Sequence, residues 1–269
     1  MRFDQNRQWV GAVYAEDLAL MREMLAEDPS LADSSHTEFD DPYRSDRYLV
    51  PTLLFAVSGP PPQQVDWRNI KRPSCYDMVH LLLEAGADPN IESGHGMPMC
   101  YVRDKRIAQC LISYGAEINR WATGGGSPLF FSVWNADPER LKLQLEFGVD
   151  VTKCDPRTGE SALHIACLQK PDTPEQESDL LELVRLLLNE GVDLHGRTNM
   201  NVESYALQGC PLLFQDTPLH LAAVFGFDSL IELLLSHGCD KSLRNENGET
   251  PHNLAVRNKR PERIINLLT

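Results

Sequence analysis

Apolar residues recur along the chain in short blocks at the spacing of an amphipathic helix. Leu180, Leu183, Val184 and Leu187, for example, fall on one face of a helix with about 3.6 residues per turn. Several blocks end on the phrase Leu-Leu-x-x-Gly-x-Asp or a weaker copy of it, with the glycine at Gly86, Gly115, Gly148, Gly191 and Gly238. Glycine adopts positive φ without strain, so each of these residues indicates the end of a helix.

A second phrase marks where helices begin. It appears as DTPLHLAA at 216–223, ESALHIAC at 160–167, GSPLFFSV at 126–133 and ETPHNLAV at 249–256. Threonine or serine before proline is a helix-start signal, because the hydroxyl caps free N–H groups and proline suits the first turn. Each repeat is therefore predicted to be a short helix, a turn, a second helix and a glycine stop, followed by an irregular link.

The two phrases alternate at a regular distance. In a repeat without insertions the second phrase has its proline at Pro218, the glycine stop follows at Gly238, and the next proline is Pro251. This spacing corresponds to a period of about 33 residues, and with the Thr-Pro-Leu-His and Gly-Ala-Asp phrases it makes the chain resemble the ankyrin repeat family over nearly its whole length. The resemblance implies an all-α fold with short β-hairpin fingers: an ankyrin-repeat solenoid of about seven helix-turn-helix units with capping units and four insertions.

The repeat boundaries predict a single ankyrin repeat domain over 1–269. An N-terminal repeat is expected at 1–33, a C-terminal cap at 248–269, and internal repeats at 51–92, 96–119, 126–152, 160–194 and 216–241. The insertions at 34–50 and 196–214 lengthen links between repeats, and those at 60–74 and 170–178 lengthen helix-to-helix turns. We expect the long links on the edge where fingers project and the long turns on the opposite edge. For each of these loops, a role in binding and the absence of any role are about equally expected.

Composition narrows the classes of partner. The 269 residues are 42% hydrophobic and carry a formal charge of −14, so nucleic acid and anionic membrane surfaces are not expected as partners. No apolar run is long enough to span a bilayer, and the N-terminus lacks the apolar core of a signal peptide. The seven scattered cysteines form no Cys-x-x-Cys pair, which predicts reduced thiols in a cytoplasmic protein; secretion as an effector without a signal peptide stays open.

No catalytic, cofactor or metal site is predicted. The resemblance implies that His164 and His220, in the Thr-Pro-Leu-His position, make structural hydrogen bonds between the loops of successive repeats. Cys167 lies three residues after His164, as in a nucleophilic Cys–His pair, but it fills a small buried position of the repeat. His95, Cys100 and Cys110 match no zinc-binding spacing.

The resemblance also implies a function, which is non-catalytic binding of a protein or peptide on the concave face of fingers and first helices. The family's contact positions, carried over residue by residue, are Arg120, Trp121, Trp134, Asn135, Arg157, Gln169, Phe225 and Arg257. Aromatic residues and arginine are enriched at binding hot spots. An alternative of equal weight is that these aromatic rings pack beneath the 196–214 insertion instead of contacting a partner. We expect a monomer, and the acidic net charge suggests a basic partner.

An enzyme or small-molecule binder is the alternative, with a site built from the 34–50 and 196–214 insertions. Fold does not decide function, so the alternative is judged on the site itself. It requires convergent titratable groups, and no spacing in the sequence brings the candidates together: His36, Asp40, Asp41, Tyr101, His195 and Tyr205. An enclosed pocket with perturbed carboxylates or histidines favours the enzyme, and an open groove favours the binding module.

Overall fold

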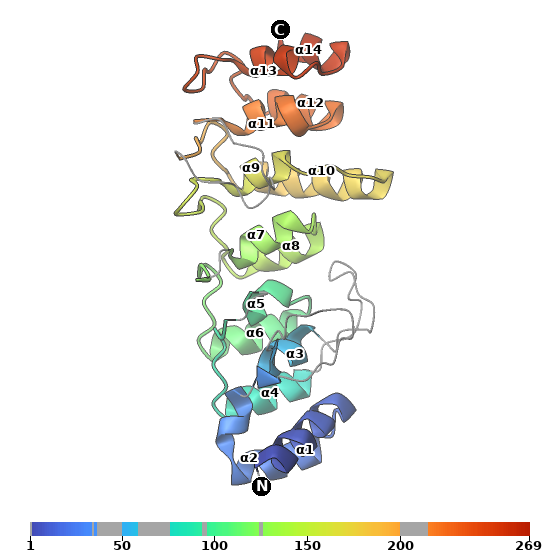
Figure 1. Cartoon of the computed structure of the whole chain (residues 1–269), viewed down its shortest axis with the longest axis vertical. Helices are drawn as coiled ribbons and strands as arrows, with labels where there is room; N and C mark the ends of the chain where they lie inside the picture. Colours follow the sequence, from blue (N-terminus) through green and yellow to red (C-terminus); the bar gives the residue numbers. More distant parts are fainter. Residues whose placement is uncertain are drawn as a thin grey trace. The chain divides into compact units, whose positions relative to one another are not determined.

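The computed structural model describes residues 2–33, 35–36, 50–58, 76–92, 96–123, 126–199 and 215–269. Within these residues seven helix pairs follow one another along the chain (Figure 1). The chain divides into two compact units, Met1–Pro128 (unit 1) and Leu129–Thr269 (unit 2). The single domain expected over 1–269 stays a prediction. The insertion at 60–74 lies outside the described residues, as do all but the ends of those at 34–50 and 196–214.

Unit 1 holds three helix pairs. The first is α1 (Arg2–Ala15) with α2 (Leu18–Glu27), followed by the short 3-10 helix η1 (Pro29–Asp33). The strands β1 (Ser35–His36) and β2 (Val50–Pro51) pair antiparallel, with Ser35 opposite Pro51. Next come α3 (Thr52–Ser58) with α4 (Tyr76–Glu84), and α5 (Pro98–Tyr101) with α6 (Lys105–Ser113). The first helices of successive pairs pack on each other, as α3 does on α5, and so do the second helices, as α4 does on α6. This is the arrangement of a stack of repeats.

Unit 2 continues the pattern with four pairs. They are α7 (Pro128–Trp134) with α8 (Pro138–Glu146), α9 (Ala162–Cys167) with α10 (Pro174–Asn189), α11 (Pro218–Phe225) with α12 (Asp228–Ser236), and α13 (Pro251–Arg257) with α14 (Glu262–Leu268). Here α11 packs between α9 and α13, and α12 contacts both α10 and α14. In Figure 1 the links between pairs of unit 2 lie on one side of its helices.

The helix starts and stops fall where the two phrases predict them. Thr217 and Thr250 precede α11 and α13, and each forms a capping box with the residue three positions later. Gly115 and Gly191 follow α6 and α10 with φ of 97° and 80°, a conformation that a side chain disfavours. The predicted helical repeat is confirmed at both kinds of boundary.

One insertion differs from the prediction. The extra residues at 170–178 do not form a long turn, because α10 begins at Pro174 and takes up 174–178 as additional helix. The side chain of Thr173 accepts a hydrogen bond from the Gln176 N–H at 3.3 Å, and Pro174 occupies the first turn. These capping signals outweigh the turn character of the segment. In Figure 1 the start of α10 therefore extends beyond its neighbours, on the side away from the links.

The cores explain why the pairs stack. In unit 1 Trp9 is fully buried, and its indole N–H donates to Thr52 Oγ1 at 3.4 Å, which joins α1 to α3. In unit 2 every residue of α9 is buried, because α9 is covered by α10 and α11. Apolar burial between neighbouring pairs is the main source of stability in such stacks. Each repeat is too small to have a core without its neighbours.

Candidate functional site

Histidine links successive repeats of unit 2. The Nδ1 atom of His164 accepts from the Ser161 N–H at 3.1 Å, so its Nε2–H donates to the Asp216 carbonyl at 3.1 Å. His220 repeats the arrangement with the Thr217 N–H at 3.2 Å and the Glu249 carbonyl at 3.0 Å. These bonds have the structural role that the resemblance implies, which is to join the helix start of one repeat to the link of the next.

Burial sets the protonation of these groups. It lowers the pKa of His164 and of His220 from 6.5 to about 4, so both imidazoles are neutral at pH 7. Burial also raises the pKa of the Cys167 thiol well above its ordinary value. A protonated, fully buried thiol is not a nucleophile, so the His164–Cys167 spacing has no catalytic meaning.

The exposed ends of first helices in unit 2 carry four of the predicted contact residues. Trp134 and Phe225, the last residues of α7 and α11, are half-buried, and so is Gln169 after α9. Trp134 meets Phe130 edge to face with ring centroids 6.3 Å apart, and the Lys170 ammonium lies 5.4 Å from the centre of the Phe225 ring. The fourth, Asn135, has a local role, because its amide donates to the Phe131 carbonyl at 2.7 Å. Part of each aromatic side chain at these helix ends is therefore exposed to solvent.

Carboxylates neutralise the predicted arginines. Arg157 in unit 2 pairs with Asp155 at 3.2 Å, and Arg257 at the end of α13 pairs with Glu249 at 2.7 Å. In unit 1 Arg120 pairs with Glu92 at 3.1 Å, and the neighbouring Trp121 is half-buried. The Thr123 hydroxyl donates to the same Glu92 carboxylate, and this bond is the main reason for its lowered pKa. Arg120 and Arg157 lie on fingers and Arg257 lies at a helix end, and a carboxylate compensates the charge of each.

Two arginines that the sequence did not single out lie on the links of unit 2. The Arg197 guanidinium donates from Nη1 to the Gln215 carbonyl at 3.1 Å and to the Arg244 carbonyl at 2.9 Å. The Arg244 guanidinium donates to the Gly248 carbonyl at 2.6 Å. Both side chains are exposed. Their equivalent places after the glycine stops are the only signal in the sequence that could have indicated them, and Arg197 falls within the 196–214 insertion.

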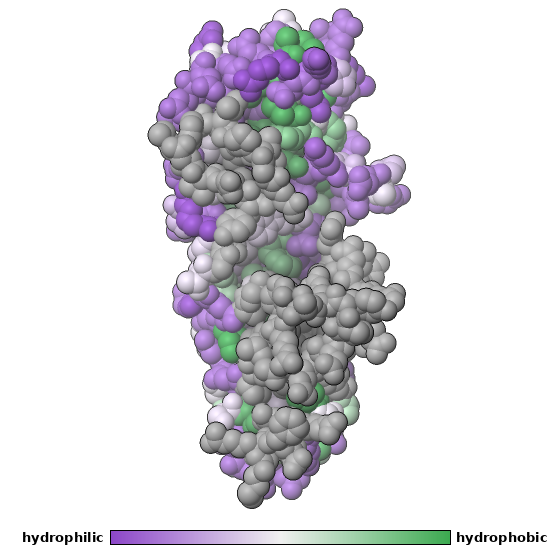
Figure 2. All heavy atoms as spheres, viewed as in Figure 1, coloured by the Kyte–Doolittle hydropathy of each residue, from purple (hydrophilic) through white to green (hydrophobic). Residues whose placement is uncertain are grey.

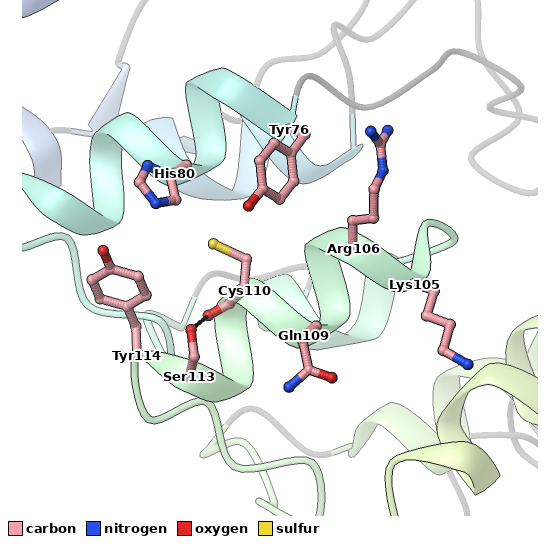
Figure 3. Close-up of a pocket in the computed structure, with 8 residues that line it drawn as sticks. All are labelled: Tyr76, His80, Lys105, Arg106, Gln109, Cys110, Ser113 and Tyr114. Carbon is pink, nitrogen blue, oxygen red and sulfur yellow. Dashed lines mark hydrogen bonds between the residues drawn. The ribbon is translucent and has the colours of Figure 1, made fainter.

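Unit 1 has an open hollow on its second helices. It has a volume of about 490 Å³ and lies between α4 and α6, as Figure 3 shows. Tyr76 and His80 line it from α4, and Cys110 and Tyr114 from the opposite side, with the His80 and Tyr114 rings 6.2 Å apart. Burial raises the pKa of the Cys110 thiol, which therefore stays protonated. The hollow offers aromatic contact surface without an activated nucleophile.

The described part of the chain offers little to the enzyme alternative. Tyr101 is buried in α5, and His195 Nε2 accepts from the Asp240 N–H at 3.0 Å as a link between repeats. Asp40, Asp41 and Tyr205 lie outside the described residues. In the described ranges no three His, Cys, Asp or Glu side chains converge on a point where a metal ion could bind. In the same ranges, no helix is long and apolar enough to cross a bilayer.

Comparison with known proteins agrees with this geometry. The family model of ankyrin repeats (3 copies) matches residues 175–269. The B-cell lymphoma 3 protein homolog of Mus musculus is 30% identical over 202 residues, which cover 71% of this chain. The crystal structure of the ankyrin repeat domain of Bcl-3 superposes with a TM-score of 0.65 at 22% identity and covers 97% of each chain. This chain belongs to the ankyrin repeat family.

Other relatives match shorter stretches of this chain. NF-kappa-B inhibitor alpha of Homo sapiens is 31% identical over 97 residues, which cover 36% of this chain and 25% of that protein. The 2-5A-dependent ribonuclease of Homo sapiens is 38% identical over 79 residues, which cover 28% of this chain and 10% of that enzyme. This ankyrin chain spans 39% of the length of the B-cell lymphoma 3 protein homolog.

Proposed function

We propose that this chain is a non-catalytic protein–protein interaction module, which binds a protein or peptide along the exposed ends of its first helices and the neighbouring fingers. One observation carries the proposal. The bodies of α9 and α11 are buried, whereas the residues at the ends of first helices in unit 2 leave aromatic and polar surface in solvent, as at Trp134, Gln169 and Phe225. Half-exposed aromatic anchors beside polar groups are typical of binding hot spots.

The relatives support a binding role. NF-kappa-B inhibitor alpha acts, by its name, on another protein, and it shares ankyrin repeats with this chain. The enzyme alternative has less support, because the ribonuclease matches over only 10% of its length and the thiols Cys110 and Cys167 are protonated. A protein partner, a monomeric state and a cytoplasmic location stay predictions for this chain.

The test is affinity capture from the native cell, followed by calorimetry with the purified captured protein. The variant Trp134→Ala with Phe225→Ala is expected to weaken binding by about tenfold or more, because truncation of an aromatic anchor removes a hot spot. The variant Trp121→Ala tests a predicted contact residue on a finger of unit 1. Circular dichroism is expected to show little change in melting temperature for each.

The matched control is Phe147→Ala, which removes a half-buried aromatic ring after the second helix α8. It is expected to leave the dissociation constant within about twofold, because it lies away from the ends of first helices. Equal loss of binding in the control, or unchanged binding in the double variant, contradicts the proposed face. A large drop in melting temperature of the double variant shows that the two rings belong to the core.

A further inference from the structure

We propose that Arg197 and Arg244 form an anion-binding edge on the links of unit 2, and that this edge takes the carboxylates of an acidic segment in the protein partner. The inference rests on the proposed binding role and specifies the chemistry of part of the partner. It runs against the basic partner suggested by the net charge of −14, because a local arrangement of cations decides what binds at one edge.

The two arginines are joined by the backbone. Arg197 precedes α11 and Arg244 precedes α13, and the Arg197 Nη1 atom lies 2.9 Å from the Arg244 carbonyl oxygen. The same nitrogen donates to the Gln215 carbonyl, so Arg197 spans two successive links. Arg244 closes its own finger by donating to Gly248. Backbone carbonyls thus fix where both guanidinium groups lie.

Neither arginine forms an ion pair with a carboxylate of the described residues. Among the described residues, no carboxylate lies within ion-pair distance of either guanidinium group, whereas Arg157 and Arg257 on the same unit each contact one. A guanidinium has five N–H donors, and the bonds seen here use only Nη1 of each arginine. The Nε and Nη2 donors remain for a ligand, in the fork geometry that matches a carboxylate.

The arrangement favours binding in two ways. Both side chains are exposed, so a ligand reaches them without displacing a neighbouring side chain. Their carbonyl contacts already restrict the rotamers, which reduces the entropy that an arginine loses when it binds an anion. In Figure 2 the coloured atoms at the upper left, where the link before α13 lies, are mostly hydrophilic, as a surface for a charged segment requires.

The experiment uses the full chain and a defined probe. The probe is a fluorescein-labelled dodecapeptide of alternating glutamate and leucine, and the comparison peptides carry glutamine or lysine in place of glutamate. Fluorescence anisotropy is expected to show binding of the glutamate peptide alone, with an affinity that falls as salt is added. The variants Arg197→Gln and Arg244→Gln are each expected to weaken binding about fivefold or more, since each removes a charge-assisted donor.

Arg185→Gln is the matched control, because it makes the same change of charge at an exposed position on the second helix α10. It is expected to leave the affinity unchanged within about twofold. Arg197 also joins two links, so Arg197→Lys serves as a second variant that keeps the charge and is expected to bind more tightly than Arg197→Gln. Circular dichroism melts show that each variant is folded.

The inference is overturned if the glutamate peptide binds no better than the glutamine peptide. It is also overturned if Arg185→Gln loses as much affinity as Arg197→Gln and Arg244→Gln. These results are distinct from failure of the proposed function. If a captured partner depends on Trp134 and Phe225 but not on Arg197 and Arg244, the binding module stands and the anion-binding edge does not.

Discussion

Acid is expected to destabilise unit 2 through its two buried histidines. Burial lowers the pKa of His164 and His220 from 6.5 to about 4, so the folded chain keeps both rings neutral in a pH range where the unfolded chain protonates them. The unfolded state then binds more protons, and the free energy of unfolding falls as the pH falls below 6.5. The loss ends near pH 4, where the folded state takes up the same protons.

The size of the effect follows from the pKa change. One pKa unit corresponds to about 1.4 kcal/mol, so the full shift of each histidine is worth about 3 kcal/mol. Between pH 6.5 and pH 5 each histidine is expected to remove about 1.5 kcal/mol of stability, or about 3 kcal/mol for both. This range lies above the pH at which most carboxylates titrate, which keeps the histidine contribution separate.

The chain itself supplies the substitution for the test. Asn253 takes the equivalent place before α13, where its Oδ1 atom accepts from the Thr250 N–H at 2.9 Å. In His164→Asn with His220→Asn the helix caps are therefore kept, but the bonds to the Asp216 and Glu249 carbonyls are lost. We expect a cost of about 1 kcal/mol per site at pH 7, together with a flatter pH dependence.

Two measurements check the reasoning. Imidazole NMR signals followed from pH 8 to pH 4 are expected to show His164 and His220 unchanged until the lower end of the range. Urea unfolding followed by circular dichroism is expected to give midpoints that fall from pH 6.5 to pH 5 in the natural chain and change less in the double variant. Titration of either ring near pH 6.5, or an equal fall in both proteins, refutes the argument.

Three further predictions concern stability. Thr173→Ala removes the cap of α10 and is expected to cost about 1 kcal/mol and reduce the helical circular dichroism signal, since the Gln176 N–H loses its acceptor; an unchanged signal contradicts this role. Gly226→Ala places a Cβ 2.7 Å from the Ala222 carbonyl oxygen and is expected to lower stability by about 1–3 kcal/mol. Thermal melts compare it with the control Gly11→Ala, whose Cβ meets nothing within 4 Å, and equal melting temperatures refute the clash. Deletion of 246–269 removes α13, which covers α11, and is expected to cause aggregation seen by light scattering; an unchanged melting temperature contradicts coupling between neighbouring repeats.

The sequence predicted which residues belong to the candidate face, but it did not predict their contacts. The repeat places Trp134, Gln169 and Phe225 at the ends of first helices, and the structure agrees that they reach solvent. The sequence did not show that Arg157 and Arg257 pair with carboxylates, or that Arg197 and Arg244 have no carboxylate partner among the described residues. Arg197 contacts a carbonyl 47 residues away, and no local pattern reports a contact over that distance.

The sequence by itself determined where most helices begin and end, because capping hydroxyls, prolines and glycine stops act on the backbone within a few residues, although the start of α10 inside the 170–178 insertion was not predicted. It also determined the repeat, since a fixed period brings the same apolar face back in each successive helix pair. Only the tertiary structure decided that the two histidines are neutral, and which arginines of the described residues pair with a carboxylate. Burial depends on side chains brought together from neighbouring repeats, and ion pairing depends on where the folded backbone places each side chain, so the order of residues along one repeat does not contain that information.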